Sequence, residues 1–167
     1  NINDAYSLTR DELRRLTSPE GSATTLISTQ KEQLIEGVFK LSEKKASELM
    51  VPRDEMIYIN SRSSSEEIVE VARQHATTRF PVFDEETQKF TGVIHIMDVL
   101  EHRRTKENLS HFLRAPQFVG ENATADDLIP QMQLTRQPLL MVQNENEEVV
   151  GMLTMQRLLS EVVGPVA

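Results

Sequence analysis

The chain of 167 residues contains one pattern twice, and this internal repeat limits its possible folds more than any other feature. At an offset of 60, the matching positions are Ser64, Glu67 and Ile68 with Thr124, Asp127 and Leu128. At an offset of 59, they are Val82, Gly92 and Val99 with Met141, Gly151 and Leu158. One deletion between helix and strand would reconcile the two offsets. A repeated unit of this kind indicates that the copies stack and bury a common core.

Each copy reads as strand, helix, strand, strand, helix. The predicted strands are 56–59, 80–83, 90–94, 116–119, 139–142 and 149–153, with helices after Ser64 and Thr124 and over 96–102 and 155–163. Ser64 with Glu67, and Thr124 with Asp127, have the spacing of helix-capping pairs. Polar turns at 84–89 and 143–148 predict antiparallel hairpins, with Pro81 at a sheet edge or strand start. The fold class is therefore α+β, and a ligand site belongs in the cleft where the two copies meet.

The segment before the repeats is expected to be polar and irregular over residues 1–27 and helical over 29–44. Thr29 and Glu32 are spaced as a capping box that would begin this helix. Its apolar stripe, which includes Leu34 and Val38, is expected to be a core or dimer contact. The next helical turn, at 46–50, should stop before Pro52.

Composition excludes several classes of protein. The net charge of −8 argues against a duplex nucleic-acid binder with a broad basic face. The absence of cysteine excludes disulfide scaffolds, thiolate zinc sites and cysteine nucleophiles. The four histidines lack the spacing of a zinc site, and no nucleophile elbow or phosphate-binding glycine loop occurs, so we do not expect an enzyme. Because the sequence begins with Asn1, we expect it to be a piece of a longer protein.

Two segments carry a resemblance to a known family. The strand 79–83, Arg-Phe-Pro-Val-Phe, and the segment 92–98, Gly-Val-Ile-His-Ile-Met-Asp, resemble the CBS domain, whose signature is Gly-apolar-x-Ser/Thr-x-x-Asp. The second copy of that signature is 151–157, Gly-Met-Leu-Thr-Met-Gln-Arg. The tandem is similar to a CBS pair, or Bateman module. This implies two β-α-β-β-α repeats packed as a pseudo-twofold pair behind an N-terminal helical segment.

A narrower resemblance lies upstream of the repeats. The helix at 32–41 and the Met-Val-Pro-Arg sequence at 50–53 are similar to those of the CorC/HlyC and cyclin M (CNNM) hemolysin-like membrane proteins. The expected organisation is a leading segment and linker helix over 1–45, a first CBS domain over 46–106 and a second over 107–167. The resemblance implies a cytoplasmic portion of a bacterial inner-membrane protein. Its expected partners are the transmembrane domain of the same full-length chain and a second copy, through a homodimer of CBS pairs.

The CBS resemblance also implies a ligand and the residues that would contact it. The ligand is an adenine nucleotide, AMP or ATP, with or without Mg²⁺. The implied binding residues are Asp54, Arg79, Pro81, His95, Asp98, Thr154 and Arg157. In relatives the signature Asp binds ribose hydroxyls, the Ser/Thr binds ribose or phosphate, and an Arg at position 79 lies near the phosphates. Here the signature is split, because His95 replaces the Thr of the first copy and Arg157 replaces the Asp of the second. Arginine cannot accept a hydrogen bond from ribose, but it can clamp phosphate.

Each of these residues also has a structural interpretation. Arg79 could be solvated beside the acidic turn, and Asp98 could simply favour a helix start. Thr154 could cap the last helix, and Asp54 could be a turn acceptor. His95 reads as a structural or solvated side chain. The acidic turns 84–86 and 145–148 could be solvated faces or a weak magnesium site.

Two functions follow from these interpretations. The first is a regulatory CBS pair of a CorC-like protein linked to magnesium or cobalt efflux, which senses an adenine nucleotide between the repeats. The alternative is a dimerisation or interaction module with a degenerate nucleotide site, for which Arg157 would be the trace of lost binding.

Overall fold

The computed structural model describes residues 22–102 and 109–163, and it has the α+β architecture expected from the repeat. The leading elements are α2 (Ser22–Glu43), α3 (Ala46–Leu49), β1 (Val51–Pro52) and the 3-10 turn η1 (Arg53–Glu55). The first repeat then supplies β2 (Ile59–Asn60), α4 (Ser65–His75), β3 (Arg79–Asp84), β4 (Lys89–His95) and α5 (Ile96–His102). The second supplies η2 (Leu109–Phe112), β5 (Phe118–Gly120), α6 (Ala125–Thr135), β6 (Leu139–Gln143), β7 (Val149–Thr154) and α7 (Met155–Val163).

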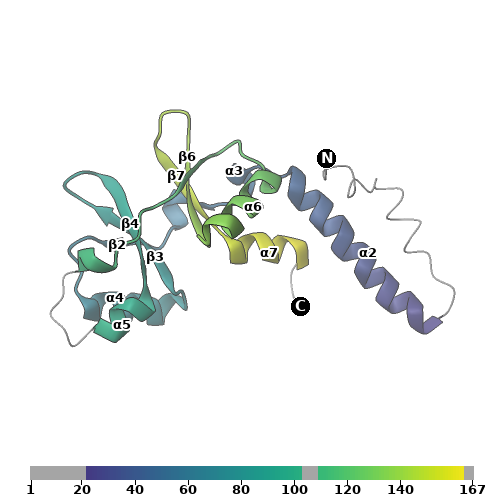
Figure 1. Ribbon diagram of the computed structural model, residues 1–167, viewed down its shortest axis with the longest axis horizontal. Coiled ribbons are helices and arrows are strands. Elements are labelled where there is room, and N and C mark those ends of the chain that lie inside the picture. The colour runs from purple at the N-terminus through teal and green to yellow at the C-terminus, as the bar shows by residue number, and fades with distance from the viewer. Residues whose placement is uncertain (1–21, 103–108, 164–167) are drawn as a thin grey trace.

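The strands form two sheets, one for each repeat, with helices on their outer faces (Figure 1). The order in the first sheet is β2-β3-β4, and in the second β1-β7-β6-β5. Both polar turns close antiparallel hairpins, as predicted. The helix α2 extends away from the second repeat, on the side opposite the first (Figure 1).

The strand that precedes the first repeat pairs with the sheet of the second. Val51 of β1 lies opposite Met152 of β7. In the first sheet, Arg114 makes an antiparallel bridge to Val93, the repeat equivalent of Met152. Each hairpin is therefore flanked by the segment that leads into the other repeat, and the two repeats form a pseudo-twofold pair.

The strand registers show that the one-residue deletion in the second repeat does not lie between helix and strand, where the sequence predicted it. Val82 lies opposite Gly92, and Val142 lies opposite Gly151, so β3 and β6 still match at the offset of 60. Val82 therefore corresponds to Val142 and not to Met141, and the sequence alignment of this strand was wrong by one residue. The missing residue lies in the hairpin turn of the second repeat, since exposed turns tolerate deletions better than strands do.

Pro81 lies in the central strand of its sheet, not at an edge or a strand start as predicted. In the second repeat, the N–H of Met141, the equivalent residue, donates to the carbonyl oxygen of Gln117 at 2.8 Å. The Pro81 nitrogen thus faces the chain just before β2, whose pairing begins only at Ile59. A missing donor is tolerated there, and this explains why β2 is one residue shorter than β5.

One predicted helix start and one predicted capping contact also need correction. The helix α2 begins at Ser22 and not at Thr29, because nothing after Gly21 interrupts it and each added residue contributes a backbone hydrogen bond. The Ser64–Glu67 capping box is present. The Thr124 hydroxyl instead donates to the Asp127 carboxylate at 2.9 Å and makes no cap bond to the backbone.

The core has three parts. One lies under α4 and α5 in the first repeat, and a second joins the second repeat to α2 and α3 through Leu41, Ala46 and Leu49. The third lies between the sheets and contains Met56, Phe83, Phe90, Val93, Leu139 and Met141. This shared cluster holds the two repeats together and forms the floor from which the cleft residues project.

Candidate functional site

The pseudo-twofold relation divides the cleft into two equivalent halves. His95 lies opposite Arg79 across the first hairpin, and Thr154 lies opposite Leu139 across the second. His95 thus occupies the place of Thr154, and Arg79 that of Leu139. One half is named here the His95 half and the other the Thr154 half.

A small hollow of about 30 Å³ lies in the His95 half. It is lined by Arg79, Val93, His95, Arg114, Arg136, Gln137, Pro138 and Leu139, which come from both repeats. Arg79 and His95, both predicted as cleft residues, line this hollow together. Arg114 and Arg136 were missed.

His95 has a structural contact in this hollow. Its Nδ1 accepts the N–H of Met97 at 3.1 Å, which takes the place of a hydroxyl cap at the start of α5. Partial burial lowers the pKa of the His95 imidazole, and the positive charge of Arg79 lowers it further. Asp98 opposes this shift, and Arg114 adds to it. Burial, and then the charges of the two arginines, therefore hold the imidazole toward its neutral form.

Asp98 lies at the start of α5, where the signature of the family places it, and it is already paired. Its Oδ2 lies 3.4 Å from Nη2 of Arg114. A ribose at Asp98 would have to share this carboxylate with a guanidinium or displace it. Two predicted residues, His95 and Asp98, thus lie on adjacent turns of one half-site.

Thr154 ends β7 in the other half and lies immediately before α7. Its Oγ1 accepts the N–H of Arg157 at 3.2 Å, which is the capping contact that the sequence also allowed. The Arg157 side chain is exposed on the first turn of that helix. The pseudo-twofold operation transfers the lining of the His95 hollow onto Val51, Ala76, Thr77, Thr78, Arg79, Leu139, Met152 and Thr154. Arg79 and Leu139 exchange with each other, so both belong to the two halves.

Asp54 and Pro81 lie outside the lining of the hollow. Asp54, in η1, borders an open groove of about 1370 Å³ along the hairpin turns, together with Tyr58, Phe118 and Glu147. The Arg53 guanidinium lies over the rings of Phe83 and Phe90 near this groove. Pro81 is buried in β3. The structure therefore does not bring all seven predicted residues together.

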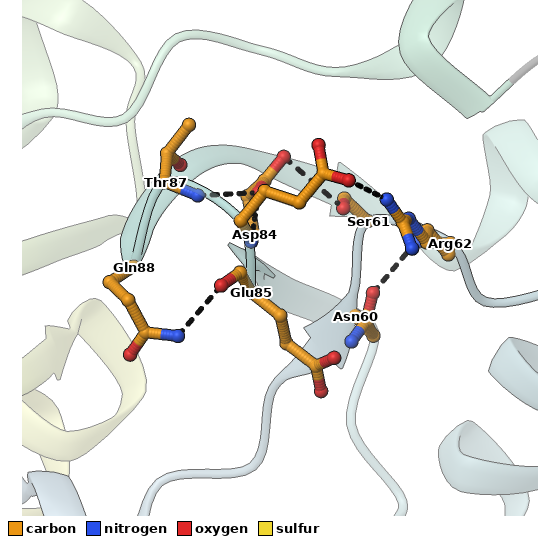
Figure 2. Close-up of polar contacts among 8 residues, drawn as sticks. Asn60, Ser61, Arg62, Asp84, Glu85, Thr87 and Gln88 are labelled. Atoms are coloured by element: carbon orange, nitrogen blue, oxygen red, sulfur yellow. Dashed lines mark hydrogen bonds and ion pairs between the residues drawn. The ribbon is translucent and has the colours of Figure 1, made fainter.

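The acidic turn of the first hairpin is held by its own hydrogen bonds (Figure 2). The N–H groups of Glu86 and Thr87 donate to Oδ1 of Asp84 at 2.8 and 3.0 Å, and the Ser61 hydroxyl donates to Oδ2 at 3.4 Å. The Thr87 contact is the main cause that lowers the pKa of the Asp84 carboxyl. The neighbouring Glu86 pairs with Arg62. These contacts support the interpretation of the turn as structural.

Among residues 22–102 and 109–163, no group of three or more His, Asp or Glu side chains is arranged to hold a metal ion. No helix there has the length and hydropathy needed to cross a membrane.

The two missed arginines differ in whether sequence could have found them. Arg136 ends α6 at the position equivalent to Ala76, three residues before the strand, so comparison of the repeats could have placed it near Arg79. Arg114 lies in the connection between the repeats, where no periodic pattern exists. Only its bridge to Val93 brings it into the cleft.

Comparison with known proteins gives a consistent result. The sequence model of the CBS domain matches residues 46–104 and 111–164. A UPF0053 protein of Mycobacterium tuberculosis is 28% identical over 148 residues, which cover 85% of this chain and 34% of that protein. The magnesium and cobalt efflux protein CorC of Salmonella typhimurium is 26% identical over 160 residues, which cover 94% of this chain and 54% of that protein. The chain thus spans between a third and about half of these relatives.

A solved structure extends the comparison from sequence to three dimensions. It is the CBS domain of a bacterial CNNM/CorC family Mg²⁺ transporter in complex with ATP. It is 27% identical to this chain, with a TM-score of 0.73, and the match covers 82% of this chain and 99% of that one.

Proposed function

Because this chain belongs to the CBS domain family and carries two of its repeats, we propose that it is the regulatory module of a CorC-like membrane protein. In this proposal it binds an adenine nucleotide between the repeats and acts on a magnesium- or cobalt-efflux activity. Residues 46–106 and 107–167 are its two CBS domains, and 1–45 its leading segment. The whole protein would place this module on the cytoplasmic side of a bacterial inner membrane.

The proposal rests on the set of residues that the pseudo-twofold relation assigns to the Thr154 half. It combines a hydroxyl at Thr154, the shared Arg79 and the small polar residues Thr77 and Thr78 beside apolar strand residues. Hydroxyls and a guanidinium suit ribose and phosphate, and the apolar strands suit a base. The ATP complex of a similar CBS pair adds support. Arg157, in place of the signature Asp, would serve the phosphates and not the ribose.

The helix α2 is the element that would pass a change in the cleft to a membrane domain. Lys44 Nζ lies 2.6 Å from Glu161 Oε2 on α7. A β-carbon on Gly37 would lie 2.7 Å from the carbonyl oxygen of Val162, so the two helices touch closely. Since Thr154 lies immediately before α7, a ligand there that favours one position of α7 also favours one position of α2.

Thermal unfolding with AMP, ADP and ATP, each with and without Mg²⁺, tests this function. A ligand at 100 times its dissociation constant stabilises the folded chain by about 2.7 kcal/mol. No stabilisation by any of these nucleotides at millimolar concentration would overturn the proposal.

Two substitutions locate the nucleotide. Thr154→Val removes the hydroxyl and should weaken binding, whereas Thr91→Val, on an exposed strand position outside both halves, should not. Arg157→Asp restores the signature carboxylate. If Arg157 clamps phosphate, this change weakens ATP binding more than AMP binding, because AMP has fewer phosphate oxygens.

The second candidate is the interaction module without a nucleotide. The observation that favours it is a set of exposed apolar side chains on three helices: Leu34, Val38, Met97, Leu100, Leu159 and Val163. Such side chains suit a homodimer of CBS pairs. Sedimentation analysis of the chain, compared with a Leu100→Glu/Leu159→Glu variant, tests it. A dimer that forms without ligand and is lost in the variant, together with no nucleotide response, would favour this candidate.

A further inference from the structure

The His95 half concentrates positive charge in a chain that is negative overall. Three arginines and one histidine line its small hollow, and no carboxylate is among the lining residues. The chain as a whole has 26 acidic and 18 basic residues. The three arginines are therefore a local concentration of positive charge, which the composition of the chain does not account for.

An anion bound among the three arginines would offset the repulsion between their like charges. Like charges at close range repel, and the repulsion is greater where water is partly excluded. Within residues 22–102 and 109–163, one ion pair is made by a lining arginine, the contact of Arg114 with Asp98 at 3.4 Å. The Arg114 side chain is still 62% exposed, so its fork of donors is largely open to a ligand. Burial is the main cause of the lowered pKa of His95, and the charges of Arg79 and Arg114 lower it further.

The backbone holds the arginines in place. Arg114 N–H donates to the Val93 carbonyl, and Val93 N–H donates to the Arg114 carbonyl, both at 2.9 Å. Gly92 permits this approach, since a β-carbon there would lie 3.1 Å from the Arg114 carbonyl oxygen. Arg136 ends α6 with a φ of 53°, and Ala76 ends α4 with nearly the same geometry. The turn itself therefore does not need an arginine at position 136.

We propose that the His95 hollow is a binding site for a small phosphate-type oxyanion, held by Arg79, Arg114 and Arg136 and separate from the nucleotide in the Thr154 half. A volume of about 30 Å³ admits a group of the size of one or two water molecules, so it fits a single tetrahedral anion and not a purine. Planar guanidinium groups bind such an oxyanion through paired hydrogen bonds. The inference does not require that a nucleotide binds elsewhere in the cleft.

The proposal also gives His95 a role. An anion in the hollow would offset the charges of Arg79, Arg114 and Arg136, while Asp98 acts in the same direction as the anion. The imidazole would then protonate more easily and could donate to the bound oxyanion. Occupation of the site thus raises the pKa of His95.

The test uses the whole chain and inorganic phosphate, titrated at constant ionic strength against sodium chloride. Binding is followed by calorimetry, and the His95 ring is followed by NMR through a pH titration. We expect saturable phosphate binding and a rise in the His95 pKa. Arg114→Gln and Arg136→Gln should each weaken binding about tenfold, since each loses charge-assisted hydrogen bonds. Arg62→Gln, in the turn after β2 and outside the lining of the hollow, is the matched control and should bind as the parent does.

Two outcomes would overturn the proposal. The first is phosphate binding that is no stronger than chloride binding, or that is unchanged in Arg136→Gln. Both glutamine variants replace exposed side chains, and unfolding curves without phosphate verify their fold. The second is loss of phosphate binding in Thr154→Val, which would mean that phosphate occupies the Thr154 half. Because ATP is titrated in parallel, failure of the nucleotide proposal is seen separately from failure of this one.

Discussion

Gly151 is the residue at which the contact between the two repeats can be tested most directly. It lies on β7 opposite Pro52 of β1, the strand that comes from the start of the first repeat. A β-carbon on Gly151 would lie 2.6 Å from the Val51 carbonyl oxygen and 2.5 Å from the Met50 sulfur. The methionine can turn aside, but the carbonyl belongs to the paired strand. Gly151→Ala should therefore push β1 away from the second sheet.

The magnitude follows from that distance. Ordinary carbon contacts begin near 3.5 Å, so the strand must move by about 1 Å. Overpacking of this kind costs about 1–3 kcal/mol. The lower entropy of the unfolded alanine chain returns roughly 0.4–1 kcal/mol. The net loss should be about 1–2 kcal/mol, which lowers Tm by roughly 2–8 °C for a chain of this size.

Urea unfolding followed by circular dichroism is the assay, and two other glycines supply controls. At Gly120 no atom lies within 4 Å of an added β-carbon, so Gly120→Ala should be neutral or slightly stabilising. At Gly92 the closest atoms are 3.0 and 3.1 Å away, so its alanine variant should be intermediate. Equal midpoints for Gly151→Ala and Gly120→Ala would refute the close packing of β1 on β7.

Three further predictions concern single side chains. Ser64→Ala should lose about 1 kcal/mol because it removes a cap bond, while Thr124→Ala should lose less because its hydroxyl bonds only a carboxylate; chemical denaturation of both compares them. The hydrogen bond from Lys44, the residue after α2, lowers the pKa of Glu161, so the folded state binds fewer protons there than the unfolded state. Stability from this contact is present above the ordinary glutamate pKa of about 4.3 and is lost as pH falls through the lower pKa of the folded state. As pH is lowered through the acid range, the melting temperature should therefore fall less steeply for Glu161→Gln than for the parent chain. Identical slopes would contradict the assignment. The side-chain oxygen of Gln117 is buried and has no hydrogen-bond partner, so Gln117→Met should raise stability by about 1 kcal/mol in urea unfolding, whereas the exposed control Gln133→Met should not.

The internal repeat allowed most of the fold to be predicted, since caps, strands and turns recur with fixed spacing. What failed was decided by contacts that spacing does not contain. The alignment could not place the deletion in the hairpin turn, because apolar strand residues such as Val82 match either neighbour equally well. Pro81 was assigned to an edge because the sequence does not show that β2 begins to pair only at Ile59, past the position that the Pro81 nitrogen faces.

The candidate site was predictable only in part, for a similar reason. His95, Asp98, Thr154 and Arg157 lie at the ends of hairpins whose positions the repeat defines. The placement of Arg114 depends on a bridge to a strand more than 20 residues earlier, and local pattern does not encode it. That bridge adds the charge of Arg114 to the His95 half, so the two halves of the predicted nucleotide cleft differ in charge.

The crossing of β1 and Arg114 onto opposite sheets bears on how this chain can fold. The segment that precedes each repeat pairs with the hairpin of the other repeat, so the outer edge of neither hairpin is paired until both repeats are folded. A chain cut between the repeats would give two fragments with open sheet edges, which should recover native structure only when mixed. The pair should accordingly unfold in one cooperative transition, although its sequence reads as two modules.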